Sequence, residues 1–145
     1  MADEIPLVKP SIGNEEILAA ERVMRSGLIT QGPEVEAFEE EFKSQMEGLN
    51  CIAVNSGTSA LHLGLLSAGV GPGDEIILPS FTFAATANAV ALTGAVPVFA
   101  DIDPKTFCIS TDSVQSLISP KTTGIMPVHL YGHPAEMKEL NSIAL

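Results

Sequence analysis

The chain is poor in positive charge. Its 145 residues include seven lysines and arginines against 18 aspartates and glutamates, which gives a formal net charge of −11 at pH 7. A field of this sign repels polyphosphates and anionic lipid headgroups. The charge balance therefore argues against nucleic acid and against an acidic membrane surface as partners.

Cysteine is also scarce, since only Cys51 and Cys108 are present and they stand far apart. Two distant cysteines form no disulfide framework, so a reducing compartment is expected. The first six residues, MADEIP, place acids and a proline where a secretory leader needs a basic start and an apolar run. These features predict a cytoplasmic protein.

Uninterrupted apolar runs of membrane-spanning length are missing. Polar residues, glycine and proline interrupt the longest candidate, residues 81–100, which divides better into a helix, a turn and a strand. Hydrophobic residues nevertheless make up 46% of the chain and charged residues only 17%, which excludes intrinsic disorder. A chain of this length and composition can bury a sizeable core.

Common signatures of nucleotide binding, hydrolysis and metal binding are absent as well. Neither GxGxxG nor GxxxxGK occurs, and there is no GxSxG nucleophile elbow. His62, His129 and His133 do not pair at helical spacing beside an acid, and the cysteines form no cluster, so no metal site is predicted. His62 falls within a predicted helix and is expected to be structural.

The hydrophobic pattern predicts two helices followed by alternating strands and helices. Apolar residues at helical spacing predict a helix over residues 15–25. After a break at Gly32-Pro33, the spacing of Val35, Phe38, Phe42 and Met46 predicts a second helix, whose glutamates form a solvated face. The remaining elements are strands at 51–54, 75–78, 96–100 and 122–130, with helices at 59–68, 83–92, 112–118 and from about Pro134 to Leu145.

This alternation, with strands that are continuous apolar runs, predicts a largely parallel sheet covered on both faces, a three-layer αβα architecture. The last predicted helix has no C-cap signal and no strand to return to, so we expect the front of a longer protein. The expected organisation is an N-terminal helical arm over residues 1–48 and the first part of a large sheet domain over residues 49–145.

Ligands of an open parallel sheet bind beyond the carboxyl ends of its strands, and residues 55–59 (NSGTS) fall there. Gly57 is expected to let the backbone turn tightly, and the free N–H groups of the following helix start form an anion site suited to a phosphate. The alternative is an ordinary helix start capped by Thr58 or Ser59.

Two further segments lie at the same edge. Residues 79–83 (PSFTF) carry an aromatic ring that can stack on a flat heterocycle, unless Phe81 and Phe83 both enter the core. Residues 129–134 (HLYGHP) hold three polar rings that can bind substrate or shuttle a proton. The alternative for them is a loop with a hydrogen-bonded histidine and an amphipathic tyrosine.

Taken in order, these segments resemble the DegT/DnrJ/EryC1/StrS family of nucleotide-sugar aminotransferases. The similar segments are GLITQGP (27–33), NSGTSALH (55–62), GDEIILPSFTF (73–83), GAVPVFAD (94–101) and PVHLYG (127–132), and the resemblance runs from about Ile5 to Leu145. It implies an incomplete large domain of a fold-type-I enzyme dependent on pyridoxal 5'-phosphate, and a homodimer with active sites at the subunit interface. The implied reaction moves an amino group from glutamate to a keto-sugar nucleotide, for surface polysaccharide or secondary metabolites.

The resemblance also assigns roles to residues. Gly57, Thr58 and Ser59 match the loop that holds the cofactor phosphate, and Phe83 matches the aromatic that stacks on the pyridine ring. Thr30 matches a stretch on the sugar side of the pocket, and His129 a position near the active-site edge.

No catalytic residue is expected in this chain, because the Schiff-base lysine and the aspartate that pairs with the pyridine nitrogen lie further on in that family. The lysines that are present are all expected to be solvated: Lys9, Lys43, Lys105, Lys121 and Lys138. Two alternatives stay open. One is a short protein that binds a phosphate ligand or a partner chain without chemistry, and the other is a sugar dehydratase of the same family, in which histidine replaces the lysine.

Overall fold

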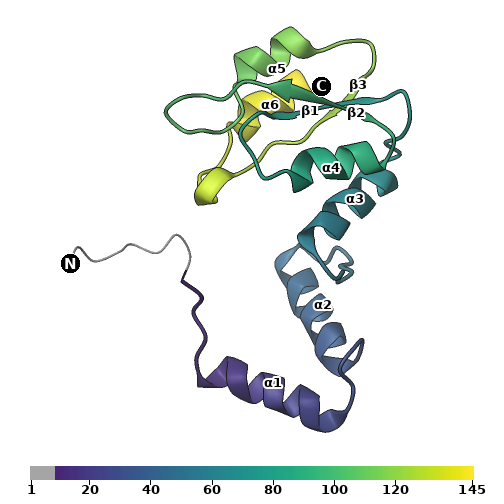
Figure 1. The fold of residues 1–145 in the computed structure, drawn as a ribbon, viewed down its shortest axis with the longest axis vertical. Coiled ribbons are helices and arrows are strands. Elements are labelled where there is room, and N and C mark those ends of the chain that lie inside the picture. The colour runs from purple at the N-terminus through teal and green to yellow at the C-terminus, as the bar shows by residue number, and fades with distance from the viewer. Residues whose placement is uncertain (1–8) are drawn as a thin grey trace, which may run out of the picture. The chain divides into compact units, whose positions relative to one another are not determined.

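A parallel sheet of three strands organises the C-terminal part of the chain in the computed structural model, which describes residues 9–145 (Figure 1). The described residues fall into two compact units. The N-terminal unit reaches to Ala53, and the C-terminal unit comprises Val54–Leu145.

Two helices make up most of the N-terminal unit, α1 (Asn14–Ser26) and α2 (Pro33–Gln45), and both predicted helices are confirmed. The carboxylate of Glu16 accepts a hydrogen bond from the Gly13 N–H at 2.6 Å, which satisfies a donor at the start of α1. Pro33 opens α2, at a position where a missing N–H costs nothing. Neither helix has a buried residue, and the predicted apolar faces, with Phe38 55% exposed, stay largely uncovered among the described residues.

The sheet of the C-terminal unit has the order β2-β1-β3, and both pairings are parallel. Its strands are β1 (Glu75–Pro79), β2 (Val96–Ala100) and β3 (Thr122–Ile125). The helices of this unit are α3 (Gly57–Ser67), α4 (Ala85–Leu92), α5 (Thr111–Leu117) and α6 (Met137–Ile143), with a 3-10 turn at Leu130–Gly132.

The central strand β1 carries the core. Ile77 packs on one face of the sheet in a cluster with Val114 of α5 and Leu140 of α6. Ile76 and Leu78 point to the other face and pack with Val90 of α4. Figure 1 shows α4 on one side of the sheet and α5 and α6 on the other. The predicted three-layer αβα architecture with a largely parallel sheet is therefore confirmed, as a partial sheet.

Two strand predictions need correction. Residues 51–54 form no strand, and Ile52 is 83% exposed, because a strand requires a hydrogen-bonded neighbour and none of residues 9–145 supplies one. The strand predicted at 122–130 ends at Ile125. Met126 still donates to the Ile77 carbonyl at 2.8 Å, but Pro127 follows and has no N–H to continue the ladder.

The last helix is shorter than predicted. It begins at Met137 rather than near Pro134, because the Ala135 N–H is bound by His129 and the Met137 N–H bonds to the Ala135 carbonyl. It ends at Ile143, so the prediction that it runs to Leu145 is wrong. Helix ends fray, which accounts for a difference of two residues. Among the described residues, no helix is both long enough and apolar enough to cross a membrane.

Candidate functional site

The turn before α3 is held together by its own polar side chains. Ser56 has extended backbone (φ −162°), and its Oγ accepts a hydrogen bond from the Ser59 N–H at 3.1 Å. The Ser59 hydroxyl donates to Asn55 Oδ1 at 2.7 Å and lies 2.9 Å from Ser56 Oγ. Ser56 is thus the N-cap, and the expectation that Thr58 or Ser59 fills it was wrong, because both already lie inside the first helical turn.

The same turn leaves donors unused. Within the described part of the chain, the N–H groups of Gly57 and Thr58 have no hydrogen-bond partner, as expected for the first residues of a helix. Both point out of the positive end of the α3 dipole. Thr58 and Ser59 are half-buried, so their hydroxyls lie in a sheltered position rather than on an open surface.

The backbone conformation of Gly57 differs from the prediction. Gly57 is the first residue of α3, with no positive φ, so the expectation that it makes a tight turn was wrong. A Cβ built on Gly57 would meet no atom within 4 Å. The side-chain position of Gly57 is therefore open, and it lies next to that residue's own unbonded N–H group. Open space, free donors and a helix dipole together fit a phosphate group.

Phe83 lies in the loop between β1 and α4, beyond the carboxyl end of the central strand. Its side chain is 80% exposed, which excludes a core position for it. The loop is nevertheless fixed, since the Thr86 N–H donates to the Phe83 carbonyl at 3.0 Å and the hydroxyls of Thr82 and Thr86 are 2.9 Å apart. The hydrogen-bonded backbone of this loop thus presents the exposed ring of Phe83 to solvent. α3 and α4 pack against each other, so this loop and residues 55–59 precede neighbouring helices.

The turn after β3 orients His129. Its Nδ1 accepts a hydrogen bond from the Ala135 N–H at 3.0 Å, so the proton of the neutral imidazole belongs on Nε2. The ring is otherwise exposed. Tyr131, 86% exposed, adopts a left-handed backbone (φ 51°), which is uncommon outside glycine. The hydrogen-bonded histidine of the alternative interpretation is therefore present, and its Nε2–H remains able to donate.

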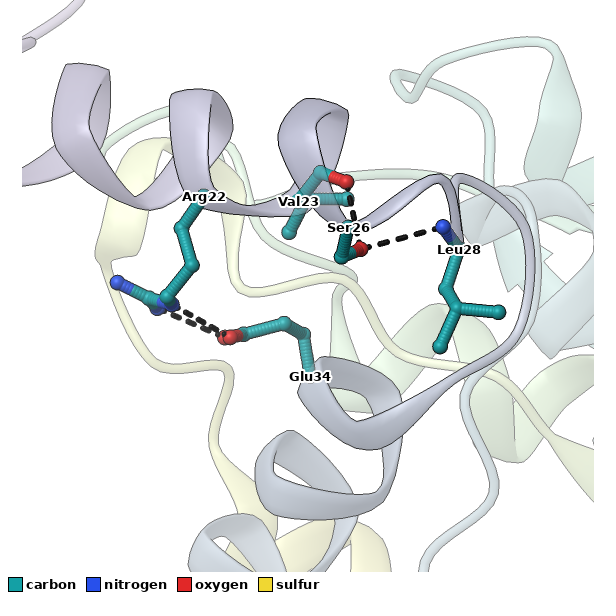
Figure 2. Close-up of polar contacts among 5 residues, drawn as sticks. All are labelled: Arg22, Val23, Ser26, Leu28 and Glu34. Atoms are coloured by element: carbon teal, nitrogen blue, oxygen red, sulfur yellow. Dashed lines mark hydrogen bonds and ion pairs between the residues drawn. The ribbon is translucent and has the colours of Figure 1, made fainter.

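Thr30 belongs to the N-terminal unit, in the loop between α1 and α2. It lines a hollow of about 230 Å³ together with residues from both helices. Arg22 of α1 and Glu34 of α2 also line this hollow. They pair with each other, Nε to Oε1 at 2.9 Å and Nη2 to Oε2 at 3.1 Å (Figure 2). The hydrogen bonds and charge of Arg22 lower the pKa of Glu34, and Glu34 in turn raises the pKa of Arg22.

The structure thus brings Gly57, Thr58 and Ser59 into one turn, and it puts Phe83 and His129 on separate loops of the same unit. Thr30 lies in the other unit. The sequence interpretation missed Ser56 as the cap, although a serine three residues before Ser59 is a readable signal. It also missed the Arg22–Glu34 pair, because a separation of 12 residues gives no local spacing signal.

Four of the five lysines are exposed as expected, and Lys43 differs. Lys43 is half-buried and its ammonium lies 3.3 Å from Glu40 at the surface of α2. The others are exposed: Lys9, Lys105, Lys121 and Lys138. Residues 9–145 contain no group of three or more histidines, cysteines, aspartates and glutamates arranged to hold a metal ion.

The chain is similar to a known family and to solved structures. The model of the DegT/DnrJ/EryC1/StrS aminotransferase family matches residues 10–145. The structure of ntda from Bacillus subtilis with bound cofactor PMP is 41% identical, with a TM-score of 0.84 over 92% of this chain and 32% of that one. The structure of S. venezuelae DesV in complex with a ketimine intermediate is also 41% identical, with a TM-score of 0.81 over 90% of this chain and 36% of that one.

A third structure, the aminotransferase from Psychrobacter cryohalolentis, is 37% identical, with a TM-score of 0.85 over 93% of this chain and 35% of that one. The chain therefore spans about a third of the length of the structures that it matches.

Proposed function

Because the chain belongs to the DegT/DnrJ/EryC1/StrS aminotransferase family, we propose that it forms the N-terminal third of an aminotransferase dependent on pyridoxal 5'-phosphate. In the proposed reaction, glutamate supplies an amino group to the ketone of a nucleotide-diphosphate sugar. The bound PMP in ntda and the ketimine in DesV support the cofactor and the class of reaction. The sugar nucleotide and the glutamate rest on the motif resemblance.

The observation that carries the proposal is the open N-terminus of α3. The N–H groups of Gly57 and Thr58 would donate to the oxygens of the cofactor phosphate, and the hydroxyls of Thr58 and Ser59 would line the same cradle. The helix dipole supplies positive potential there, in a chain whose net charge is −11. Ser56 and Asn55 fix the turn, so the donors are oriented before the phosphate arrives.

Phe83 would position the rest of the cofactor. Its exposed ring offers a flat apolar face on which a pyridine ring can stack, and the pinned loop beneath it limits the entropy lost on binding. When bound, pyridoxal phosphate supplies the electron sink that stabilises a carbanion next to nitrogen. The described residues hold and orient the cofactor. No lysine among them is desolvated enough to act as its covalent anchor, so this chain alone is expected to be inactive.

The remaining features of the proposal concern substrate and assembly. Thr30 and the free Nε2–H of His129 are assigned to the substrate side. Residues 1–48 are assigned to an N-terminal helical arm, of which residues 1–8 lie outside the described part of the chain. Residues 49–145 are assigned to the first part of the cofactor-binding domain. A homodimer with active sites at its subunit interface, and a cytoplasmic location, complete the proposal.

The test is amino transfer by the full-length protein. The protein is incubated with pyridoxal phosphate, ¹⁵N-glutamate and a panel of keto-sugar nucleotides, and the products are analysed by mass spectrometry. We expect ¹⁵N in an amino-sugar nucleotide and 2-oxoglutarate as the co-product. Loss of water from the sugar without incorporation of ¹⁵N would identify the dehydratase instead. Absence of both reactions across the panel would contradict the proposed function.

A further inference from the structure

We propose that the Arg22–Glu34 ion pair positions the loop of residues 27–32, which carries Thr30, and thereby sets the affinity of the enzyme for its sugar substrate. Arg22 and Glu34 are positioning residues in this account, because they act through the loop. The inference rests on the proposed function, from which the substrate-side role of Thr30 is taken.

Arg22 and Glu34 form a bidentate ion pair. Two parallel hydrogen bonds, of 2.9 and 3.1 Å, join the planar guanidinium of Arg22 to both oxygens of Glu34. Such a bidentate contact fixes orientation as well as distance. Arg22 lies in the second half of α1, and Glu34 is the second residue of α2. The pair therefore links the two helices on either side of the loop, as Figure 2 shows.

The ends of the loop are fixed separately. The Ser26 hydroxyl donates to the Val23 carbonyl at 2.7 Å and accepts from the Leu28 N–H at 3.1 Å, which ties the loop to the end of α1 (Figure 2). At the other end, the Gly32 carbonyl accepts from the N–H groups of α2 at 3.0 and 3.2 Å. Among the described residues, no hydrogen bond holds Thr30 itself.

Thr30 is thus placed by the two helix ends, and those ends are joined by one side-chain ion pair within the described chain. Arg22, Glu34 and Thr30 line the same hollow of about 230 Å³. If the pair is lost, α1 and α2 can shift relative to each other, and the hollow changes shape at the threonine. A shift of about 1 Å at a positioning group is enough to weaken a bound substrate measurably.

Stability alone does not explain the pair. Its side chains are 61% and 51% exposed, and ion pairs this exposed contribute little to folding free energy. Arg25 and Glu21 form a similarly exposed pair at 2.6 Å on the same helix, but both partners belong to α1, so that pair fixes no loop. Arg25→Gln is therefore a matched control for Arg22→Gln.

The experiment uses the full-length enzyme and its variants R22Q, E34Q, R22Q/E34Q and R25Q. We expect the KM for the sugar nucleotide to rise up to about fivefold in R22Q and E34Q, with kcat and the KM for glutamate unchanged. The double variant should match the single ones, since the two residues act as one unit. R22K should fall between wild type and R22Q, because lysine keeps the charge without the bidentate geometry. R25Q should match wild type.

A second readout separates this inference from the proposed function. Amide hydrogen exchange of the peptide covering residues 27–32 should be faster in R22Q and E34Q than in wild type and R25Q, whether or not the enzyme accepts a sugar. Unchanged exchange would overturn the positioning role. Faster exchange with an unchanged KM for the sugar would overturn its effect on affinity. A wild-type enzyme without transferase activity would refute the proposed function alone.

Discussion

Replacing Gly57 by alanine separates the folding of the α3 turn from its binding of a phosphate. Gly57 is the first residue of α3, and an added Cβ meets no atom within 4 Å, so the native structure tolerates the methyl group. The substitution also lowers the entropy of the unfolded chain. We therefore expect the apo protein to keep its stability or to gain up to about 1 kcal/mol in free energy of unfolding.

Cofactor binding should respond in the opposite direction. The methyl group projects beside the unbonded N–H of Gly57, and we expect it to crowd a phosphate bound there and to lengthen its hydrogen bonds to this helix end. Losing a hydrogen bond to a charged group costs about 1.5–3 kcal/mol. The dissociation constant for pyridoxal phosphate should then rise by about 10- to 150-fold.

The assay pairs urea unfolding of the apo enzyme with a titration of pyridoxal phosphate followed by its absorbance. Gly64→Ala is the matched control, because Gly64 lies in the same helix and an added Cβ there also meets nothing within 4 Å. It should leave the dissociation constant unchanged. Wild-type affinity in Gly57→Ala would refute the placement of the phosphate at this helix end, and a destabilised apo protein would refute the geometry of the turn.

Thr58, Phe83, the Arg22–Glu34 pair and the lysines each give a further prediction. Thr58→Val should weaken binding of pyridoxal phosphate by about 1–3 kcal/mol, and an unchanged dissociation constant would remove Thr58 from the cradle. Phe83→Ala should loosen the cofactor while the apo free energy of unfolding changes by less than about 0.5 kcal/mol, because the ring is 80% exposed; a loss of about 3–5 kcal/mol would mean a core position instead. The pKa of Glu34 is lowered from its ordinary value of 4.5 by Arg22, so the contribution of the pair is present above that pH and is lost as pH falls through the lowered value. The difference in exchange rate of residues 27–32 between wild type and Arg22→Gln should accordingly vanish in acid, and a difference that persists there would contradict the pairing. The 145-residue chain alone, incubated with pyridoxal phosphate and reduced with borohydride, should show only low, scattered labelling of its exposed lysines, whereas stoichiometric labelling of one lysine with turnover would refute its expected inactivity.

The strands illustrate what sequence patterns reveal and what they leave open. The segments at β1 and at residues 51–54 are both short, continuous runs of apolar residues. Ile76, Ile77 and Leu78 are at most 2% exposed because β1 is the central strand and helices cover both faces of the sheet. Ile52 has no neighbouring strand among residues 9–145. A continuous apolar run predicts that a segment favours a buried strand. Whether the strand forms depends on a second strand elsewhere in the chain to which it can hydrogen-bond.

The sequence also predicts some features of the candidate site and not others. Motif order predicted that residues 55–59 form a helix start with free donors, because glycine and hydroxyl residues after an apolar run carry a local signal. The cap was readable from the sequence too, because Ser56 stands three residues before Ser59, the spacing of an N-cap bond. The Arg22–Glu34 pair depends on how the loop of residues 27–32 orients α2 relative to α1, so no spacing in the sequence predicts it.

The central claim is that the N-terminus of α3 binds the phosphate of pyridoxal 5'-phosphate. The most direct measurement is a crystal structure of the full-length protein with the cofactor bound. The account predicts phosphate oxygens within about 2.7–3.2 Å of the N atoms of Gly57 and Thr58, whose N–H groups are unbonded at the start of α3. A phosphate held elsewhere, with water at these two N–H groups, would contradict it.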